Sequence, residues 1–440
     1  MKRDDVASVA KGSPGCCLVG FNCYLWSVFM DKNQKTFSYG YVIAASCFSI
    51  QAIGVGIYVA YGVFFNPLIA EFGWSRTIIS GASSVAFLIM GIFGIFVGRF
   101  NDRFGPKKLM SITAIFLGVG YLLMSRLTAV WQLYLFYGII FGIGLSSIDV
   151  IAMTTIARWF TLKRGMMTGI VKVGTGAGQF TLPLLASVLI SLYGWRNAYV
   201  IIGTAAMVIL VGIAQLLKRD PGQVEVTPGL KRSVLKTKKK TISVNLTLEE
   251  ALRTVQLWII CVVNLTLLFC LMSIMVHIVP HARDIGLSAS RAAWVLSTIG
   301  GVSMIGRFIA GLAIDRVGSK QVMIICFFLL IAGLLWLQTA DALWMLFLFA
   351  CVYGIAHGGF FTAISPLVAE LFGIKSHGVI FGIVACFGAI GGAAGPILAG
   401  YIFDNSGSYS IYFWLITFME MLSLGLMFLL KPIQIASDEM

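Results

Sequence analysis

Two stretches of this sequence decide its fold: Gly98-Arg99-Phe100-Asn101-Asp102-Arg103-Phe104-Gly105-Pro106-Lys107 and Gly311-Leu312-Ala313-Ile314-Asp315-Arg316-Val317-Gly318-Ser319-Lys320. Gly, Asp-Arg, Gly and Lys recur in the same order at an offset of 213 residues. Each stretch, called here a paired loop, follows a long apolar run. The repetition predicts a chain built from two halves of similar structure.

The repeat extends well beyond the paired loops. At the same offset, glycines, a proline and a tyrosine recur in pairs. These pairs are Gly165 and Gly378, Gly169 and Gly382, Gly178 and Gly391, Pro183 and Pro396, and Tyr199 and Tyr412. A fixed period of this kind reveals a repeated structural unit. Parallel repeats of membrane helices are typical of proteins that alternate access to a site near the bilayer midplane.

The composition excludes a water-soluble protein. Of the 440 residues, 59% are hydrophobic and only 11% are charged, whereas soluble domains carry roughly 25% charged residues. The mean hydropathy is +0.93. A net charge of +14 can indicate a nucleic-acid surface, but here the basic residues lie in short runs between apolar segments. We therefore expect a lipid bilayer as the surroundings and no nucleic-acid partner.

The apolar runs predict an all-α membrane protein with twelve transmembrane helices in two six-helix repeats. A crossing takes about 20 apolar residues, and such runs follow one another from Tyr39 onward. We divide the chain into a leader, an N-terminal bundle, a basic linker, a C-terminal bundle and a tail. These segments cover residues 1–38, 39–217, 218–255, 256–431 and 432–440.

The basic residues predict the orientation. Loops that face the cytoplasm carry an excess of Lys and Arg. With both termini inside, 25 of the 32 basic residues lie on the cytoplasmic side and five lie outside. The remaining two, Lys172 and Arg307, fall within spans. We expect a multi-pass protein of the inner or plasma membrane with cytoplasmic termini.

The paired loops and the twelve spans resemble the major facilitator superfamily over residues 39–431. Three further motifs are similar to its monocarboxylate transporter and oxalate/formate antiporter branch. They are Tyr61-Gly62-Val63-Phe64-Phe65, Phe72-Gly73-Trp74-Ser75-Arg76, and Gly306-Arg307 with Gly311 following. The resemblance implies a carrier that works by rocking its two halves.

Each paired loop supplies charge that can latch the two halves together. Asp102 and Asp315 can accept hydrogen bonds from backbone N–H groups or arginines. The resemblance implies that such a latch stabilises the outward-facing state; a purely topological role for the basic residues is the alternative. The candidate latch residues are Gly98, Asp102, Arg103, Gly105 and Lys107, and Gly311, Asp315, Arg316, Gly318 and Lys320.

Ionisable residues inside the membrane are functional candidates, because each costs about 2.5–3.5 kcal/mol to insert. Asp149, Lys172 and Arg307 all lie about 12 Å inside the cytoplasmic ends of their helices. Asp149 and Lys172 can form an ion pair that neutralises both charges. Alternatively, Asp149 carries a proton and responds to Lys172 and to substrate.

Arg307 has no acid near it on its own span, since the residue four positions earlier is Ser303. Its planar fork suits a carboxylate in bidentate geometry. The resemblance assigns the substrate carboxylate to this arginine; pairing with an acid of another helix, such as Asp149, is the alternative. Animal members commonly have an aspartate at the position of Ser303 and a lysine in span 1. This chain has neither of them.

Each of the remaining polar candidates has two possible roles. Tyr137 and Tyr353 recur in both halves and either pack between helices or line the cavity. Asn264 either contacts substrate or bonds a neighbouring helix. His357 either titrates or stays neutral among the helices, and Glu420 either pairs or holds a proton.

Together these features predict a secondary-active transporter of small monocarboxylates such as lactate or pyruvate, coupled to protons. Substrate binding is assigned to Arg307, Lys172, Asn264, Tyr137, Tyr353 and Ser303, and proton coupling to Asp149, His357 and Glu420. The alternatives are an oxalate/formate-type anion antiporter and a non-transporting sensor. The chain has no phosphate-binding loop, metal cluster or catalytic triad. We expect no enzyme activity, no cofactor and a monomeric functional unit.

Overall fold

A computed structural model describes residues 35–161, 163–221 and 245–433 of the chain. The leader up to Gln34, most of the basic linker and the end of the tail lie outside these ranges. Within them, every regular element is a helix. The elements of the N-terminal half are α2 (Lys35–Ala60), η1 (Tyr61–Phe64), α3 (Phe65–Phe72), α4 (Arg76–Phe104), α5 (Pro106–Met124), α6 (Val130–Leu133), η2 (Tyr134–Phe141), α7 (Gly142–Trp159) and α8 (Arg164–Leu216).

The C-terminal half follows the linker and repeats the pattern. Its elements are α10 (Leu248–Leu252), α11 (Val255–Asp284), α12 (Ala289–Val317), α13 (Ser319–Leu337), α14 (Leu343–Phe372), α15 (His377–Ser406) and α16 (Ser410–Leu429). The short helix α10 belongs to the predicted linker. It begins with a capping box in which the side chains and backbones of Thr247 and Glu250 bond reciprocally.

Helix length and apolar composition confirm an all-helical membrane protein. Within the described ranges, eleven helical segments are long and apolar enough to cross a bilayer. One of them, α8, has 53 residues, about 80 Å at 1.5 Å per residue, whereas the hydrocarbon core is about 30 Å thick. Gly194 interrupts it with φ 76°, a left-handed backbone that glycine adopts without strain. Divided at Gly194, α8 supplies two crossings, and the total agrees with the twelve predicted.

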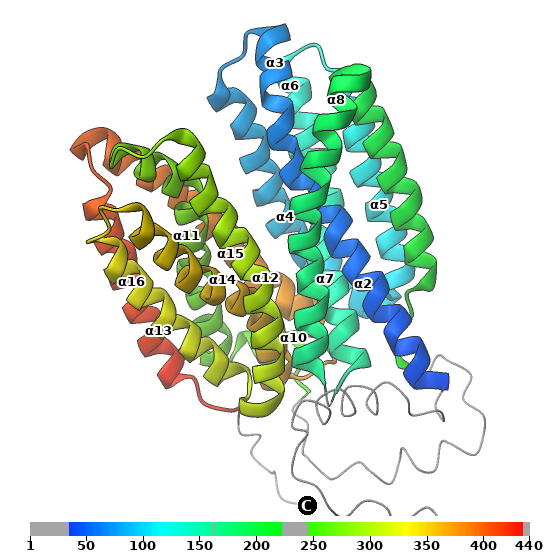
Figure 1. Cartoon of the computed structure of the whole chain (residues 1–440). Helices are drawn as coiled ribbons and strands as arrows, with labels where there is room; N and C mark the ends of the chain where they lie inside the picture. Colours follow the sequence, from blue (N-terminus) through cyan, green and yellow to red (C-terminus); the bar gives the residue numbers. More distant parts are fainter. Residues whose placement is uncertain (1–34, 162, 222–244, 434–440) are drawn as a thin grey trace, which may run out of the picture.

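The two halves are arranged alike (Figure 1). In the N-terminal half α2 packs on α8, and in the C-terminal half α11 packs on α15. Between the halves, α4 packs against α15 and α12 packs against α8. These four helices therefore form the boundary between the two bundles.

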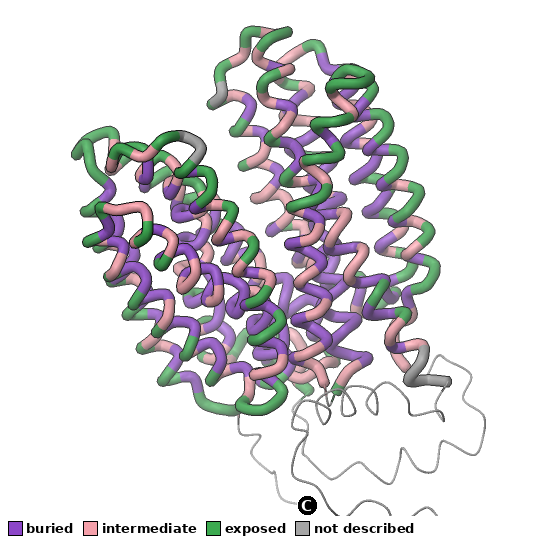
Figure 2. The backbone as a smooth tube through the Cα atoms, viewed as in Figure 1, coloured by how far each residue is buried: buried purple, intermediate pink, exposed green. Residues whose placement is uncertain are grey.

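Burial follows what a lipid environment requires. Buried residues fill the interior of each bundle, and exposed ones lie on the outer faces (Figure 2). Many exposed residues are large and apolar, including Phe180 at 68% and Ile397 at 70% exposure. Such side chains on the outside of long apolar helices are suited to contact with acyl chains, because all backbone groups are bonded within the helix.

The two halves are joined at one end of the molecule, called here the loop end because both paired loops lie there. Figure 1 shows the ribbons of the halves close together at this end and further apart at the opposite one. Asp102 accepts hydrogen bonds from the backbone N–H groups of Gly378 (3.2 Å) and Val379 (3.0 Å), which begin α15. Asp315 accepts them from Gly165 (2.7 Å) and Met166 (2.9 Å), which begin α8.

Each aspartate therefore caps a helix of the opposite half. The positive end of a helix dipole favours such a carboxylate. Asp102 also accepts a 2.8 Å bond from Arg158 of its own half. We call this reciprocal arrangement the interlock; it consists of Asp102 with the start of α15 and Asp315 with the start of α8.

The glycines of the paired loops permit this close approach. A β-carbon at Gly98 would collide with the backbone of Gly378, and one at Gly311 with the backbone of Gly165. Gly105 and Gly318 have positive φ values of 84° and 90°, so they turn the chain sharply between two helices.

The basic residues of the loops lie beside the interlock without forming it. Lys320 donates to the carbonyl oxygens of Phe428 and Leu430 at the end of α16, where a cation is favoured by the helix dipole. The guanidinium of Arg103 lies 5.2 Å from the ring of Phe104. Lys107 lies in the first turn of α5, and Arg316 lies in the last turn of α12.

Candidate functional site

A cavity of about 330 Å³ lies between the two halves. Helices α2, α4, α7 and α8 of the N-terminal half line it, and α11, α12, α14 and α15 of the C-terminal half complete it. Five of the predicted site residues line this cavity: Asp149, Lys172, Asn264, Arg307 and His357. Sites of this kind, built between repeats from inward-facing side chains, are typical of transporters.

Arg307 lies on α12, where this helix crosses α8. Arg307 is only 2% exposed. Nη1 donates a 3.1 Å hydrogen bond to the carbonyl oxygen of Lys172, which links the two halves, while Nε is buried without a partner. Within the described ranges no carboxylate lies within 4.0 Å of the guanidinium. Arg307 is therefore a buried cation without a counter-ion in contact.

Lys172 and Asp149 face each other across α8 and α7 and form an ion pair. Asp149 Oδ1 also accepts a 2.7 Å hydrogen bond from Gln51 Nε2 on α2. The Lys172 side chain is 5% exposed, whereas that of Asp149 is 38% exposed. Water in the cavity can therefore reach the carboxylate but hardly the ammonium group.

A hydrogen-bonded chain of neutral side chains supports this pair. Gln51 Oε1 accepts a 2.9 Å bond from the hydroxyl of Thr175, one turn along α8 from Lys172. This bond orients the Gln51 amide so that its Nε2 points toward Asp149. Gln51 and Thr175 line the cavity together with Gln179. None of these three residues is charged, so the intramembrane charges of the sequence do not indicate them. Polar side chains at one level of spans 1 and 5 are the sequence signal for this group.

Asn264 and His357 contribute from the C-terminal half. The Asn264 amide donates a 2.8 Å bond to the Val384 carbonyl of α15, so it joins two helices and also faces the cavity. His357 on α14 is 6% exposed, and its Nδ1 has no hydrogen-bond partner. Its ring packs 5.0 Å from that of Phe361. Phe361 in turn lies 5.9 Å from the Lys172 ammonium group.

The other four predicted site residues lie away from the cavity. The Tyr137 hydroxyl donates to the Tyr58 carbonyl, and the Tyr353 hydroxyl donates to that of Leu271. Both rings are fully buried. The Ser303 hydroxyl donates to the Gly300 carbonyl one turn earlier. Glu420 on α16 is 0% exposed, and neither carboxyl oxygen has a partner.

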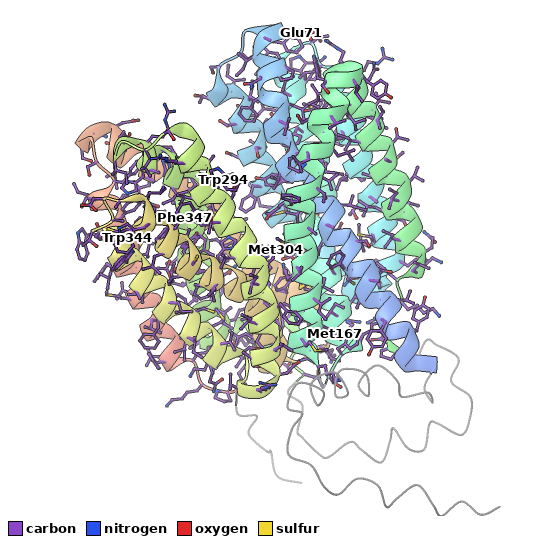
Figure 3. The ribbon with its side chains drawn as sticks, in the orientation of Figure 1. Glu71, Met167, Trp294, Met304, Trp344 and Phe347 are labelled. Carbon is purple, nitrogen blue, oxygen red and sulfur yellow. The ribbon has the colours of Figure 1, made fainter. Side chains whose placement is uncertain are left out.

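Above the charged layer, on the side away from the loop end, the cavity is lined mainly by apolar side chains. Leu268, Leu271, Met272 and Met275 supply one wall from α11, and Phe87 and Met90 supply another from α4. Figure 3 shows how closely the side chains of the two halves approach: Met304 of α12 lies at their boundary, where Gly176 of α8 leaves room for it.

The charges of the cavity sum to one excess positive charge. Arg307 and Lys172 are cationic and Asp149 is anionic, and the first two are held in one layer by the Nη1 bond to the Lys172 carbonyl. One anionic group is thus sufficient to neutralise the site. Within the described ranges, no cluster of three or more His, Cys, Asp or Glu side chains is arranged to hold a metal ion.

Sequence comparisons agree with this architecture. The chain matches the Major Facilitator Superfamily over residues 42–312 and 276–437. It is 25% identical to Monocarboxylate transporter 12 of Homo sapiens, over 88% of this chain and 79% of that protein. It is 28% identical to MFS-type transporter 1 of Ophiocordyceps sp. (strain BCC 1869), over 88% and 83%. Monocarboxylate transporter 13 of Bos taurus is 24% identical, over 85% of each chain.

Solved structures share the fold at lower identity. The proton:xylose symporter XylE superposes with a TM-score of 0.70 at 16% identity, covering 89% of this chain and 96% of that one. The human organic anion transporter MFSD10 superposes with a TM-score of 0.66 at 14% identity, covering 90% and 100%. At these identities the likeness concerns the fold.

Proposed function

The chain belongs to the Major Facilitator Superfamily, and from that premise we propose that it is a secondary-active carrier of small monocarboxylates coupled to protons. A membrane transporter of this superfamily moves its substrate through the space between its two halves, and here that space is the cavity described above. The similarity to monocarboxylate transporters, at 24–25% identity, supports the substrate class.

The buried guanidinium of Arg307 is the observation that carries the proposal. Its Nε lacks a partner and no carboxylate contacts it within the described ranges. A buried, unpaired charge is costly unless it gains a counter-ion. A carboxylate satisfies two N–H groups of a guanidinium at once. A substrate bound there would lie where the two halves meet, because Arg307 also donates to the Lys172 carbonyl of α8.

The excess of one positive charge favours a monocarboxylate over a dicarboxylate. Lys172 is already paired with Asp149, so it offers little to a second carboxylate. An oxalate-type dianion would have to displace Asp149 from Lys172. This argument disfavours the antiporter alternative for small dicarboxylates.

Asp149 is the group that we assign to the proton. It is the accessible member of the ion pair. A proton on Asp149 raises the charge of the cavity from one positive unit to two, and a bound carboxylate returns it to one. The loaded and the empty site then carry equal charge, so the carrier can reorient in both states at similar electrostatic cost. Anion and proton assist each other's binding by this linkage.

The interlock is assigned to the state with the loop end closed. If the basic linker and paired loops face the cytoplasm, as the distribution of Lys and Arg predicts, this state opens outward. Opening toward the cytoplasm then requires that Asp102 and Asp315 leave the helix starts of α15 and α8. Return to the outward-open state requires that they bind these helix starts again.

Uptake of labelled lactate into proteoliposomes containing the full chain tests the proposal. An imposed proton gradient should drive accumulation above equilibrium. Arg307→Gln should lower uptake at least about thirtyfold, since truncating one partner of a buried charge contact costs 2–5 kcal/mol. Arg291→Gln is the matched control, because it removes the same group from an exposed position on the same helix.

Three other outcomes contradict the proposal in different ways. Uptake that survives in Arg307→Gln refutes the assigned site. Uptake that requires internal anion and ignores the proton gradient indicates an antiporter. Binding of the acid without any flux indicates a sensor on the same fold.

A further inference from the structure

The apolar walls of the cavity reach far beyond the space that a three-carbon acid occupies. Helix α11 runs from Val255 at the loop end to Asp284 at the opposite end. Asn264 and Met275 on this helix both line the cavity. Eleven residues separate them, so the lined surface extends about 16 Å along the helix.

A carbon chain advances about 1.3 Å per bond, because its bonds are about 1.5 Å long and staggered. A three-carbon acid therefore covers about 2.5 Å of the wall, and an eight-carbon acid covers about 9 Å. The cavity volume of about 330 Å³ lies within the range of about 300–1,000 Å³ that is typical of pockets for drug-sized ligands.

The chemistry of the wall changes with distance from the loop end. The charged layer holds Arg307, Lys172 and Asp149, and Phe361 lies directly beside it. Beyond this layer, α11 presents Leu268, Leu271, Met272 and Met275, and α4 presents Phe87 and Met90. Methionine and phenylalanine side chains adapt to flat or flexible apolar groups. The site thus has one anion-binding end and one apolar end.

The α11 wall and the α4 wall approach each other at Gly392 of α15. A β-carbon at Gly392 of α15 would lie 3.0 Å from Cγ of Met272 and 3.0 Å from Cε1 of Phe87. These side chains come from opposite halves and approach each other over the same glycine. Phe87 and Met272 also line the cavity, so an apolar group that lies along these two side chains would contact both halves.

We propose that the preferred substrates are monocarboxylates with an apolar body of about six to eight carbons, straight or aromatic, that binds along the α11 and α4 walls. This inference rests on the proposed function, because it places the carboxylate on Arg307. It adds a statement about the size and polarity of the rest of the substrate. Lactate and pyruvate then bind the same carboxylate site, but more weakly than these longer acids.

A series of straight-chain acids from propionate to decanoate tests the inference. Apparent Kd values come from thermal stabilisation of the full chain in lipid nanodiscs. Affinity should rise about fourfold for each added methylene, the value expected for burial of a CH₂ group, and level off near eight carbons. Arg307→Gln measures nonspecific partitioning, which should be small compared with binding to the unaltered chain.

The wall itself is tested by the double variant Met272→Ala, Met275→Ala. Octanoate affinity should fall about tenfold, while propionate affinity stays the same. Val276→Ala is the matched control, since Val276 is 54% exposed on the same helix and does not line the cavity. If the double variant does not fold, Met272→Gln removes the apolar contact at nearly constant volume.

The outcomes separate the two proposals. If short acids bind and affinity does not change with chain length, the inference about size is wrong and the carboxylate site stands. If long acids stabilise Arg307→Gln as strongly as the unaltered chain, they act on the lipid and the inference is again wrong. If no acid of any length binds, the proposed function fails as well.

Discussion

At the scale of single residues, the charged layer contains one cation that no carboxylate of the described residues contacts and one acid that is accessible from the cavity. Arg307 is buried without a carboxylate in contact, and Asp149 is the exposed partner of a buried lysine. The spacing of these residues from the helix ends was enough to predict one common layer. Which atoms pair within it depends on the rotation of each helix, and that is set by packing between helices.

Replacing Asp149 by Asn should separate anion binding from proton coupling. The amide can still accept a hydrogen bond from Lys172, but the cavity gains one positive charge. Carboxylate affinity should therefore stay the same or increase, whereas gradient-driven accumulation should fall at least about tenfold. Equilibrium binding and proteoliposome uptake measure the two effects. The control is Asp404→Asn, which changes an exposed acid at the opposite end; equal loss of binding and accumulation in Asp149→Asn would refute the assignment.

Glu420 should tolerate neutralisation. Its carboxyl group is 0% exposed and has no hydrogen-bond partner within the described ranges, and an ionised, unpaired carboxylate there would cost several kcal/mol. Glu420→Gln should leave gradient-driven uptake unchanged and the melting temperature equal or higher. Loss of gradient-driven uptake with intact folding would transfer the proton role from Asp149 to Glu420.

At the scale of elements, close contacts between helices depend on repeated glycines. Gly178 of α8 faces the Ala52 carbonyl of α2, and Gly391 of α15 faces the Leu265 carbonyl of α11. These positions are related by the sequence repeat, and both are packing sites between helices. Tyr137 and Tyr353 also recur in both halves, and both are buried away from the cavity. For these two tyrosines, recurrence in both halves indicated the packing role correctly, whereas their polarity had suggested a place in the cavity.

Gly178→Ala should lower the stability of the N-terminal bundle by ~1–3 kcal/mol, because the new methyl group meets a backbone carbonyl that cannot rotate away. The matched control is Gly212→Ala on the same helix, where nothing lies within 4 Å. There the substitution should be neutral or stabilising, since alanine favours helix over glycine by ~1 kcal/mol. Melting temperatures of the purified variants measure the difference; equal shifts would show that the contact is unimportant.

The interlock should control the balance between the two open states. Asp315→Asn removes the charge of the cap and one of its two acceptor oxygens. A loss of at least ~1 kcal/mol at a helix start shifts the ratio of states at least about fivefold. Spin labels at the exposed outer positions Tyr193 and Asn405 should report shorter distances in this variant. Asp341→Asn, an exposed acid in the loop before α14, serves as control and should leave the distances unchanged.

At the scale of the whole molecule, the sequence predicted the twelve crossings, the two halves and the interlock residues. It could not define where the first span ends. This span continues through η1 and α3 to Phe72, since Asn66 and Pro67 lie in the first turn of α3, where a proline is tolerated. The polar residues Gln51 and Thr175 are visible within spans 1 and 5 of the sequence. That Gln51 links Thr175 to Asp149 follows only from the packing of α2 against α8.

The orientation in the membrane gives a prediction for the entire chain. Lys375 is exposed in the loop between α14 and α15 at the loop end, and Asn405 is exposed at the opposite end. In intact cells, an impermeant thiol reagent should label Asn405→Cys but should label Lys375→Cys only after permeabilisation. Six described cysteines are buried or half-buried. Both variants also carry serine in place of Cys16, Cys17 and Cys23 of the leader, which keeps the background low. The reverse pattern would show that the paired loops face outward.

The reciprocity of the interlock has a consequence for symmetry. Asp102 binds the start of α15 and Asp315 binds the start of α8, so each of these two helices is capped by an aspartate of the opposite bundle. In two identical six-helix subunits, the same contact would be isologous, with one surface complementary to itself across a twofold axis. A single unit could thus satisfy it by pairing with a second copy. Joining both copies in one chain keeps the twofold contact at the loop end, while each cavity wall is free to diverge: Arg307 occupies the position that Gly94 holds in the other copy.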